Sequence, residues 1–305
     1  MKAASIDLGT NTFRLLAVEK VEGCSSIKVL AQKRAIVRMG EGLATTGMIS
    51  PQARNRAFKV LEDFRDTLKD LGIERCFPVA TSVFREARNA EEFLVEASRI
   101  LGCPIRVISG EEEARLTLLG GLWDLEIESG ILFDIGGGST EFILFSRRFP
   151  LKLVSTPLGV VKLTEAMIHH DPPTPREVER IRAQIRKELK EVTGVLGSRA
   201  ANLVGTAGTV TTLAAIDLKL STYDHQKVHG HRLTKDRIED LLKIFLSLSR
   251  KERLKIKGME EGREDLIIPG TLITLETMEN WEQKELVVSD LGLREGALID
   301  GLGCR

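Results

Sequence analysis

Two short segments of the sequence repeat one pattern of residues that could bind an anion. Residues 5–16 read S-I-D-L-G-T-N-T-F-R-L-L, and residues 132–144 read L-F-D-I-G-G-G-S-T-E-F-I-L. In each segment an apolar strand ends in an aspartate, and a turn of glycine and small polar residues leads into a second apolar strand. Such a turn exposes backbone N–H groups and hydroxyls to a phosphate-like group. We therefore predict two copies of one phosphate-binding turn.

The two aspartates of these turns, Asp7 and Asp134, are candidate metal ligands. A carboxylate at the end of a buried strand is unfavourable unless a cation or backbone donors compensate it. We expect the two turns to face each other, so that both aspartates approach one divalent ion. Glu141, at the start of the second return strand, is predicted to reach the same ion or its waters. The alternatives are a turn-capping aspartate for Asp7 and an exposed strand residue for Glu141.

The other polar residues of the two turns are predicted to bind phosphate oxygens. Glycines let the backbone approach the anion, and the hydroxyl and amide side chains donate hydrogen bonds. Arg14 lies two residues beyond Thr12 on a strand and so shares its face of the sheet; a surface arginine is the alternative. The predicted phosphate-binding residues of these turns are Gly9, Thr10, Asn11, Thr12, Arg14, Gly136, Gly137, Gly138, Ser139 and Thr140.

Two further segments carry candidate chemistry. The segment T-A-G-T-V-T-T-L, residues 206–213, follows an apolar strand and opens a helix, so Gly208 and Thr209 are predicted to form a third anion site at a helix N-terminus. A plain connection without ligand is the alternative. Glu111, Glu112 and Glu113 begin another helix, where carboxylates also favour the positive end of the helix dipole. One of the three could orient or deprotonate water during phosphoryl transfer.

Alternating strands and helices predict an α/β protein that positions these residues. In the first half we expect a hairpin over residues 3–19, strands at 27–32, 78–81 and 105–109, and helices from Ser50-Pro51, over 90–101 and from Gly110. In the second half, Thr174 to Glu177 is a capping box for a helix through about Leu196. We predict two domains, residues 1–125 and 126–305, with the last helix able to pack back on the first.

Composition limits the classes of function. With 305 residues, 42% of them hydrophobic, the chain can form two cores of ordinary size. Lys+Arg and Asp+Glu both number 44, so no overall field attracts nucleic acid or a membrane surface. The N-terminal residues lack a signal-peptide pattern, and no apolar run reaches about 18 residues, which predicts a soluble cytoplasmic protein. The four cysteines, Cys24, Cys76, Cys103 and Cys304, have no C-x-x-C spacing and are expected to be reduced thiols.

Three polar groups have weaker predictions. The charged stretch 249–265 is expected to be solvated surface in preference to a polyanion track. His225, His229 and His231 are expected to be surface or substrate-side residues instead of metal ligands, and Lys227 with His229 could contact distal phosphates. Asp290 and Arg294 are expected to form an ion pair at i, i+4 spacing.

The two turns together resemble those of the actin, sugar-kinase and heat-shock-chaperone superfamily. Three more segments, V-I-S-G-E-E-E-A-R-L at 107–116, G-T-A-G-T-V-T-T-L at 205–213 and S-D-L-G-L-R-E-G at 289–296, resemble the exopolyphosphatase and guanosine pentaphosphate phosphohydrolase family. The resemblance covers essentially the whole chain. It implies two ribonuclease H-like, actin-like ATPase lobes with a cleft between them that contains Mg²⁺, and hydrolytic removal of a terminal phosphate. Whether Mn²⁺ replaces Mg²⁺ stays open.

The family pattern also selects individual residues. It identifies Glu113 as the catalytic glutamate, and Arg85 as an arginine that could clamp phosphate through its forked guanidinium; Arg88 is expected to be solvated. Inorganic polyphosphate is the first predicted substrate and guanosine pentaphosphate, a stringent-response nucleotide, the second, with homodimerisation left open. Longer family members carry additional C-terminal domains, which this chain is expected to lack, so long-chain processivity is not predicted.

Two other classes of protein remain open from the sequence. An ATP-dependent small-molecule kinase would share the turns but would need an adenosine pocket, for which 305 compact residues leave little room. A nucleotide-switched interaction protein of the actin or chaperone type would need a peptide-binding or polymer-forming segment, and no segment suggests one.

Overall fold

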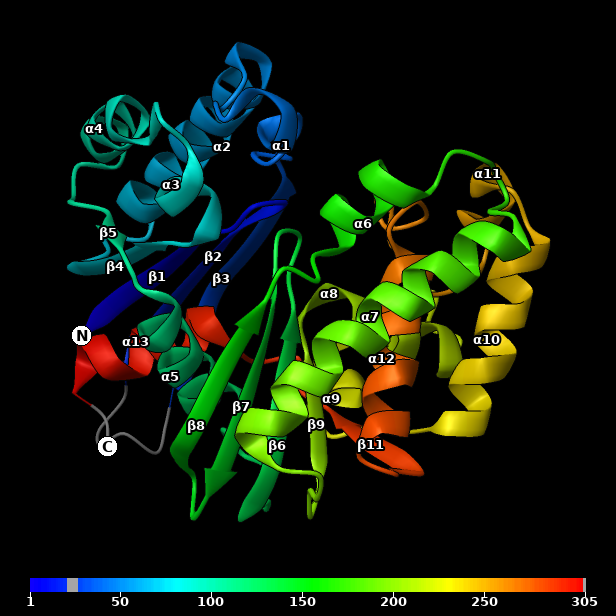
Figure 1. Ribbon diagram of the computed structural model, residues 1–305. Coiled ribbons are helices and arrows are strands. Elements are labelled where there is room, and N and C mark those ends of the chain that lie inside the picture. The colour runs from blue at the N-terminus through cyan, green and yellow to red at the C-terminus, as the bar shows by residue number, and fades with distance from the viewer. Residues whose placement is uncertain (21–26, 304–305) are drawn as a thin grey trace. The chain divides into compact units, whose positions relative to one another are not determined.

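The computed structural model describes residues 1–20 and 27–303, and the chain divides into two compact units, each with its own sheet and core (Figure 1). Unit 1 comprises Met1–Gly120 with Leu293–Arg305, and unit 2 comprises Gly121–Gly292. Both units combine helices with a sheet, so the α/β class predicted from the sequence is confirmed. No helix in the described ranges is long and apolar enough to cross a membrane.

The sheet of unit 1 has the strand order β3-β2-β1-β4-β5. β1 (Lys2–Leu8), β2 (Thr12–Lys20) and β3 (Ile27–Ile36) are antiparallel, which confirms the predicted hairpin, and β4 (Arg75–Ala80) and β5 (Arg106–Val107) continue the sheet in parallel with β1. β5 is shorter than the predicted strand 105–109, because only Arg106 and Val107 pair with β4.

Helices cover both faces of the unit 1 sheet. α2 (Pro51–Asp70) and α4 (Ala90–Leu101) share a core with one face of β1 and β2, and α5 (Gly110–Gly121) and α13 (Leu293–Leu302) lie on the other face (Figure 1). The short helices are α1 (Leu43–Thr46) and α3 (Ser82–Glu86). α2 begins as predicted, because Ala53 N donates to the Ser50 hydroxyl over 3.1 Å and Pro51 occupies the first helical position.

The central strand β1 directs alternate side chains to the two faces. Ile6 and Leu8 pack in the core under α2 and α4. On the opposite face, Ser5 Oγ donates to the Arg294 carbonyl at the start of α13 over 2.7 Å. Because side chains alternate along a strand, Asp7 lies on the same face as Ser5, toward α13.

The sheet of unit 2 has the order β10-β11-β9-β6-β7-β8. Its strands are β6 (Ser129–Ile135), β7 (Thr140–Ser146), β8 (Phe149–Thr156), β9 (Leu203–Thr206), β10 (Arg232–Thr234) and β11 (Glu285–Val288). β6, β7 and β8 form an antiparallel meander, and β9 and β11 follow in parallel with β6. Five strands of unit 2 therefore repeat the order and directions of unit 1, as the duplicated turn predicts.

The helices of unit 2 include α12, whose residues from Ile267 to Met278 are buried throughout and which packs against α6, α7, α8 and α10. They are α6 (Val160–Met167), α7 (Pro175–Leu196), α8 (Ala207–Asp217), α9 (His225–Val228), α10 (Lys235–Ser247), α11 (Arg250–Arg253) and α12 (Ile267–Asn280). The predicted capping box is present, because Glu177 N donates to the Thr174 hydroxyl and Thr174 N donates to the Glu177 carboxylate.

The charged stretch 249–265 differs from its prediction as a solvated surface. Arg253 is only 3% exposed and Arg263 only 6% exposed. Arg253 Nη2 donates to Asp171 Oδ1 over 2.6 Å, so the stretch folds inward at these positions and its charge is partly buried in unit 2.

Candidate active site

The two predicted turns are closed by equivalent backbone hydrogen bonds. In unit 1, Gly9 N donates to Thr12 O over 3.1 Å, and in unit 2, Gly136 N donates to Ser139 O over 2.9 Å. Each hydrogen bond closes a turn between an aspartate-ending strand and its return strand. The repeat visible in the sequence is thus also a repeat in local structure.

The turn in unit 1 is held by two neighbouring segments. Asn11 O accepts hydrogen bonds from Val37 N at 2.9 Å and Arg38 N at 3.0 Å. On the other side, the hydroxyls of Thr10 and Ser82 hydrogen-bond over 3.0 Å. Ser82 is the first residue of α3, a helix that the sequence analysis did not predict, so α3 is directly connected to the predicted phosphate-binding turn.

Asp7 lies opposite Arg14 in the β1–β2 register. The residue as a whole is partly accessible, but its Oδ1 is shielded from solvent and has no hydrogen-bond partner. Burial raises the pKa of Asp7 from 3.8 to about 6, although the nearby charges of Arg14 and Arg294 act to lower it. Glu295 of α13, which the sequence analysis did not single out, acts in the same direction as burial.

The environment of Asp7 fits a metal ion. A buried carboxylate oxygen without a donor is unfavourable, and a bound cation would compensate it. No group of three or more His, Cys, Asp or Glu that could hold a metal is present within residues 1–20 and 27–303. Mg²⁺ does not require such a group, because it is usually bound by one or two carboxylates together with waters and substrate phosphates.

In the second turn, Asp134 lies opposite Glu141 in the β6–β7 register, the position that corresponds to Arg14 opposite Asp7. Glu141 is only 3% exposed, so it is not the exposed strand residue of the alternative interpretation. Its Oε1 accepts a hydrogen bond from Ser155 Oγ over 2.9 Å. The two copies therefore share a turn but differ in charge. The cross-strand neighbour of Asp7 is the cation Arg14, whereas the neighbour of Asp134 is a second acid, Glu141.

Gly159, the N-cap residue of α6, allows this helix to approach the second turn closely. Val160 N donates to Gly136 O over 3.1 Å, and a Cβ on Gly159 would lie 2.3 Å from Gly137 O. Thr140 is fully buried, and its hydroxyl donates to Leu158 O over 2.5 Å. The side chain of Thr140 therefore has a structural role in unit 2, whatever its backbone contributes to the turn.

The third turn carries a buried arginine that the sequence analysis placed in the charged stretch. The guanidinium of Arg263 lies directly against Gly208, where a Cβ would come within 1.8 Å of Nη2. Thr209 is 2% exposed and packs against Gly270 of α12. Ala207, which precedes them, has a φ of 68°, an uncommon conformation for a residue with a side chain. The available sequence signal was one arginine four residues before a helix that begins with the largely apolar run I-I-P-G-T-L-I.

Arg85 and Glu113 are brought together in unit 1. Arg85 Nη1 donates to Glu113 Oε2 over 2.9 Å and to Ile108 O over 2.8 Å. Arg85 belongs to α3 and Glu113 to the first turn of α5. Only 13% of the Glu113 side chain and 28% of the Arg85 side chain are exposed.

The structure distinguishes the three adjacent glutamates. Glu111 is exposed, and Glu112 forms an ion pair with Arg106 at 3.1 Å. Glu113 alone among the three contacts Arg85. Arg88, which was expected to be solvated, is exposed and donates to Thr46 O over 2.8 Å.

The predicted ion pair between Asp290 and Arg294 is wrong. Asp290 Oδ2 is 2.6 Å from His225 Nδ1, and Arg294 pairs with Glu295 through Nε at 2.8 Å. The i, i+4 argument assumed one continuous helix, whereas α13 begins only at Leu293, after Asp290.

The histidines have structural partners within unit 2. His229 Nε2 donates to Trp123 O over 3.1 Å, and its Nδ1 accepts from Asp290 N at 3.3 Å. Burial lowers the pKa of His229 and favours this neutral form. His231 Nε2 is 2.8 Å from Asp217 Oδ2. Both ring nitrogens of His229 are thus engaged, which removes support for its predicted contact with phosphate.

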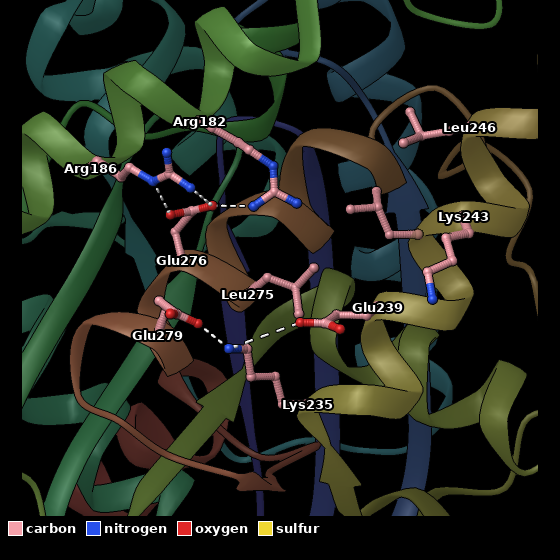
Figure 2. A pocket seen from close by; sticks show the side chains of 10 residues that line it. Arg182, Arg186, Lys235, Glu239, Lys243, Leu246, Leu275, Glu276 and Glu279 are labelled. Carbon is pink, nitrogen blue, oxygen red and sulfur yellow. Dashed lines mark hydrogen bonds and ion pairs between the residues drawn. The ribbon is translucent and has the colours of Figure 1, made fainter. Parts of the chain in front are cut away.

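Unit 2 also has a pocket of about 410 Å³ among α7, α10 and α12 (Figure 2). Buried Glu276 accepts hydrogen bonds there from Arg182 and from Arg186, the latter over 2.7 Å from Nε. None of the residues predicted for catalysis lines this pocket. Its charged groups already have ion-pair partners, so we assign it no catalytic role.

Comparison with known proteins identifies the family. The Ppx/GppA phosphatase family matches residues 17–304. The chain belongs to this family. A curated relative, exopolyphosphatase 2 of Mycobacterium tuberculosis, is 31% identical over 99% of this chain and 97% of its own length.

Solved structures support the same assignment. The Ppx/GppA family member of Aquifex aeolicus has 34% identity and a TM-score of 0.85, covering 99% of this chain and 97% of its own. An exopolyphosphatase from Cytophaga hutchinsonii has 27% identity and a TM-score of 0.91, covering 99% and 98%. The family resemblance and the actin-like fold class expected from the sequence are therefore confirmed.

Proposed function

We propose that this Ppx/GppA family protein hydrolyses the terminal phosphoanhydride bond of inorganic polyphosphate, with guanosine pentaphosphate as the second candidate substrate. The names of its relatives support the first substrate. The observation that carries the proposal is the double connection of α3: Ser82 contacts the phosphate-binding turn through Thr10, and Arg85 contacts Glu113.

This arrangement suits phosphoryl transfer to water. Such reactions depend on positioning and on neutralising charge, with little covalent chemistry by the protein. We assign Glu113 the role of orienting water and accepting its proton, and Arg85 the role of holding the Glu113 carboxylate while presenting its remaining donors to phosphate. Arg263 would neutralise a phosphate at the Gly208 turn, because its guanidinium lies against that backbone.

We propose Mg²⁺ as the cofactor, held by Asp7 through its buried Oδ1, with Asp134 and Glu141 as the candidates in unit 2. A bound Mg²⁺ would neutralise negative charge on the phosphates. The sequence predicts that Asp7 and Asp134 act on one ion. If so, the variant carrying both Asp7→Asn and Asp134→Asn loses no more activity than the more severe single variant; fully additive losses would argue for separate roles.

The decisive experiment measures orthophosphate released by the purified chain with Mg²⁺, with Mn²⁺ and with a chelator. Polyphosphates of several lengths, guanosine pentaphosphate and ATP are compared as substrates. We expect the highest kcat/KM with polyphosphate, and no release in the chelator. Hydrolysis of ATP alone, with polyphosphate and guanosine pentaphosphate inert, would contradict the proposal.

The two other classes considered from the sequence are not favoured by the family assignment. The same assay distinguishes them. A kinase would consume ATP only when an acceptor is present, and a nucleotide-switched protein would hydrolyse ATP slowly. The cytoplasmic location and a homodimeric state stay predictions.

A further inference from the structure

Cys76 and Cys103 are far apart in the sequence but adjacent in unit 1. β4 and β5 pair in parallel, with Val79 opposite Arg106 and Ala80 opposite Val107. Cys76 lies three residues before Val79, and Cys103 lies three residues before Arg106, so both residues lie at the same end of the β4–β5 pair. Cys103 lies in the bend before β5, beside the core that Cys76 also contacts from β4.

The two thiols also affect each other: each perturbs the pKa of its neighbour, and both residues pack at the edge of the core formed with α2 and α4. Neither takes part in a disulfide in this structure, and each is partly accessible. Cys24 and Cys304, the other two cysteines, lie outside the described residues.

The environments of the two sulfur atoms differ. The interaction with Cys76 lowers the pKa of the Cys103 thiol, whereas the interaction with Cys103 and burial raise the pKa of Cys76. Cys103 lies between exposed Gly102 and exposed Pro104, in the bend after α4. Cys103 is therefore the sulfur that is both more readily ionised and reachable by a small molecule.

We propose that Cys76 and Cys103 form a reversible dithiol–disulfide pair that reacts with small-molecule disulfides such as oxidised glutathione. The proposal concerns a modification site of unit 1 and does not depend on the phosphatase activity. From the sequence, the cysteines were expected to be isolated reduced thiols because they are scattered along the chain. The fold instead brings two of them together.

The reaction proceeds in two exchanges. The Cys103 thiolate attacks one sulfur of oxidised glutathione, breaking its S–S bond, so that a Cys103–glutathione mixed disulfide forms and one glutathione thiolate leaves. Cys76, after losing its proton to solvent, attacks the Cys103 sulfur and releases the second glutathione. The protein dithiol is oxidised to a disulfide and oxidised glutathione is reduced to two thiols, which take up the two protons.

The test uses the full chain with Cys24→Ser and Cys304→Ser, so that only the pair remains. After treatment with oxidised glutathione we expect an intact mass lower by two hydrogen atoms, a linked peptide containing both cysteines, and full reversal by dithiothreitol. A stable glutathione adduct without the internal bond, or disulfide-linked dimers in place of it, would overturn the proposal.

Two single variants in the same background separate the roles of the sulfurs. With Cys76→Ser, we expect the reaction to stop at the mixed disulfide, so the mass rises by one glutathione on Cys103. With Cys103→Ser, we expect Cys76 to be modified at least tenfold more slowly. Equal modification rates of Cys76 and Cys103 in these variants would contradict the assigned order of attack. Circular dichroism of each variant, in its reduced form, checks that it is folded.

Discussion

Arg85 and Glu113 form a 2.9 Å ion pair between α3 and α5, two helices of unit 1 that no long-range signal in the sequence connects. Arg85 is anchored by a second hydrogen bond to Ile108 O. The carboxylate of Glu113 is therefore held in one place, while most of the surrounding charged residues of α5 remain at the surface. A fixed, partly shielded carboxylate is what the orientation of a single water requires.

Replacing Glu113 tests its catalytic role most directly. We expect Glu113→Gln to lower kcat for polyphosphate hydrolysis by about 10²–10⁴-fold, with a much smaller effect on KM, because the variant keeps its shape but cannot accept a proton. Glu112→Gln is the matched control, one residue away on the same helix and paired with Arg106. Steady-state phosphate release should leave the control near wild type. Equal losses in both variants would point to damage to α5 instead of chemistry.

Replacing Arg85 tests the guanidinium rather than its charge. Arg85→Lys keeps one positive charge but cannot donate to Ile108 O, Glu113 and a phosphate at once. We expect kcat/KM to fall by about 10²-fold. Arg106→Lys is the control, since Arg106 forms an ion pair with the neighbouring Glu112 that is more exposed to solvent. An Arg85→Lys enzyme with wild-type kinetics would exclude a clamp.

Asp7 should make stability depend on pH in the metal-free protein. Its pKa is raised from 3.8 to about 6 on folding. The folded state therefore binds more protons between these values, and stability falls as pH rises through this window. Because one pKa unit corresponds to about 1.4 kcal/mol, the full loss above pH 6 is about 3 kcal/mol. We expect Asp7→Asn to recover about this amount at pH 8 and little at pH 4.

Urea unfolding in the presence of a chelator, at several pH values, measures this difference. The exposed aspartate Asp63, replaced by asparagine, serves as the control and should show no such recovery. If Asp7→Asn changed the free energy of unfolding equally at all pH values, the carboxylate of Asp7 would not have the raised pKa that burial causes. In the same variant we expect phosphate release to be largely lost, so that stability and activity change in opposite directions.

Because Arg263 lies against Gly208, we expect replacement of this glycine by alanine to harm activity, whereas the same replacement at an open position should not. In Gly208→Ala the new Cβ would overlap the buried guanidinium of Arg263, which must shift away from the turn. We expect kcat/KM for polyphosphate to fall at least about tenfold. Gly194→Ala in α7 is the control, because a Cβ there meets open space. That change should raise the unfolding free energy by roughly 0.5–1 kcal/mol without altering kinetics.

The capping box of α7 predicts an acid-sensitive contribution to stability. Hydrogen bonds, first from His170 and then from the Thr174 backbone, lower the pKa of Glu177. Its stabilising effect is therefore complete above the unfolded-state pKa and is lost as pH falls through the lower, folded-state pKa. We expect Glu177→Gln to lower the unfolding midpoint in denaturant at pH 7, with a difference that narrows in acid. The exposed Glu191→Gln on the same helix should change little at either pH.

Local patterns in the sequence predicted much of the secondary structure. Ser50-Pro51 and the Thr174–Glu177 box begin α2 and α7 as expected, and the duplicated turns have matching hydrogen bonds. These features depend on neighbouring residues alone, so a single sequence contains them. The short helix α3 was missed because its five residues are too few to show the 3.6-residue hydrophobic repeat of a helix.

The sequence by itself determined the two turns, their acidic residues and the family, because backbone turns and strand ends are specified by residues next to one another. Only the tertiary structure decided which distant groups meet: Arg85 with Glu113, Arg263 with Gly208, Cys76 with Cys103 and Asp290 with His225. Those contacts depend on how strands register and helices pack. No sequence spacing predicts which side chains far apart in the chain will come into contact. Their burial, which shifts the pKa values of acidic and basic groups, is set only when the cores have formed.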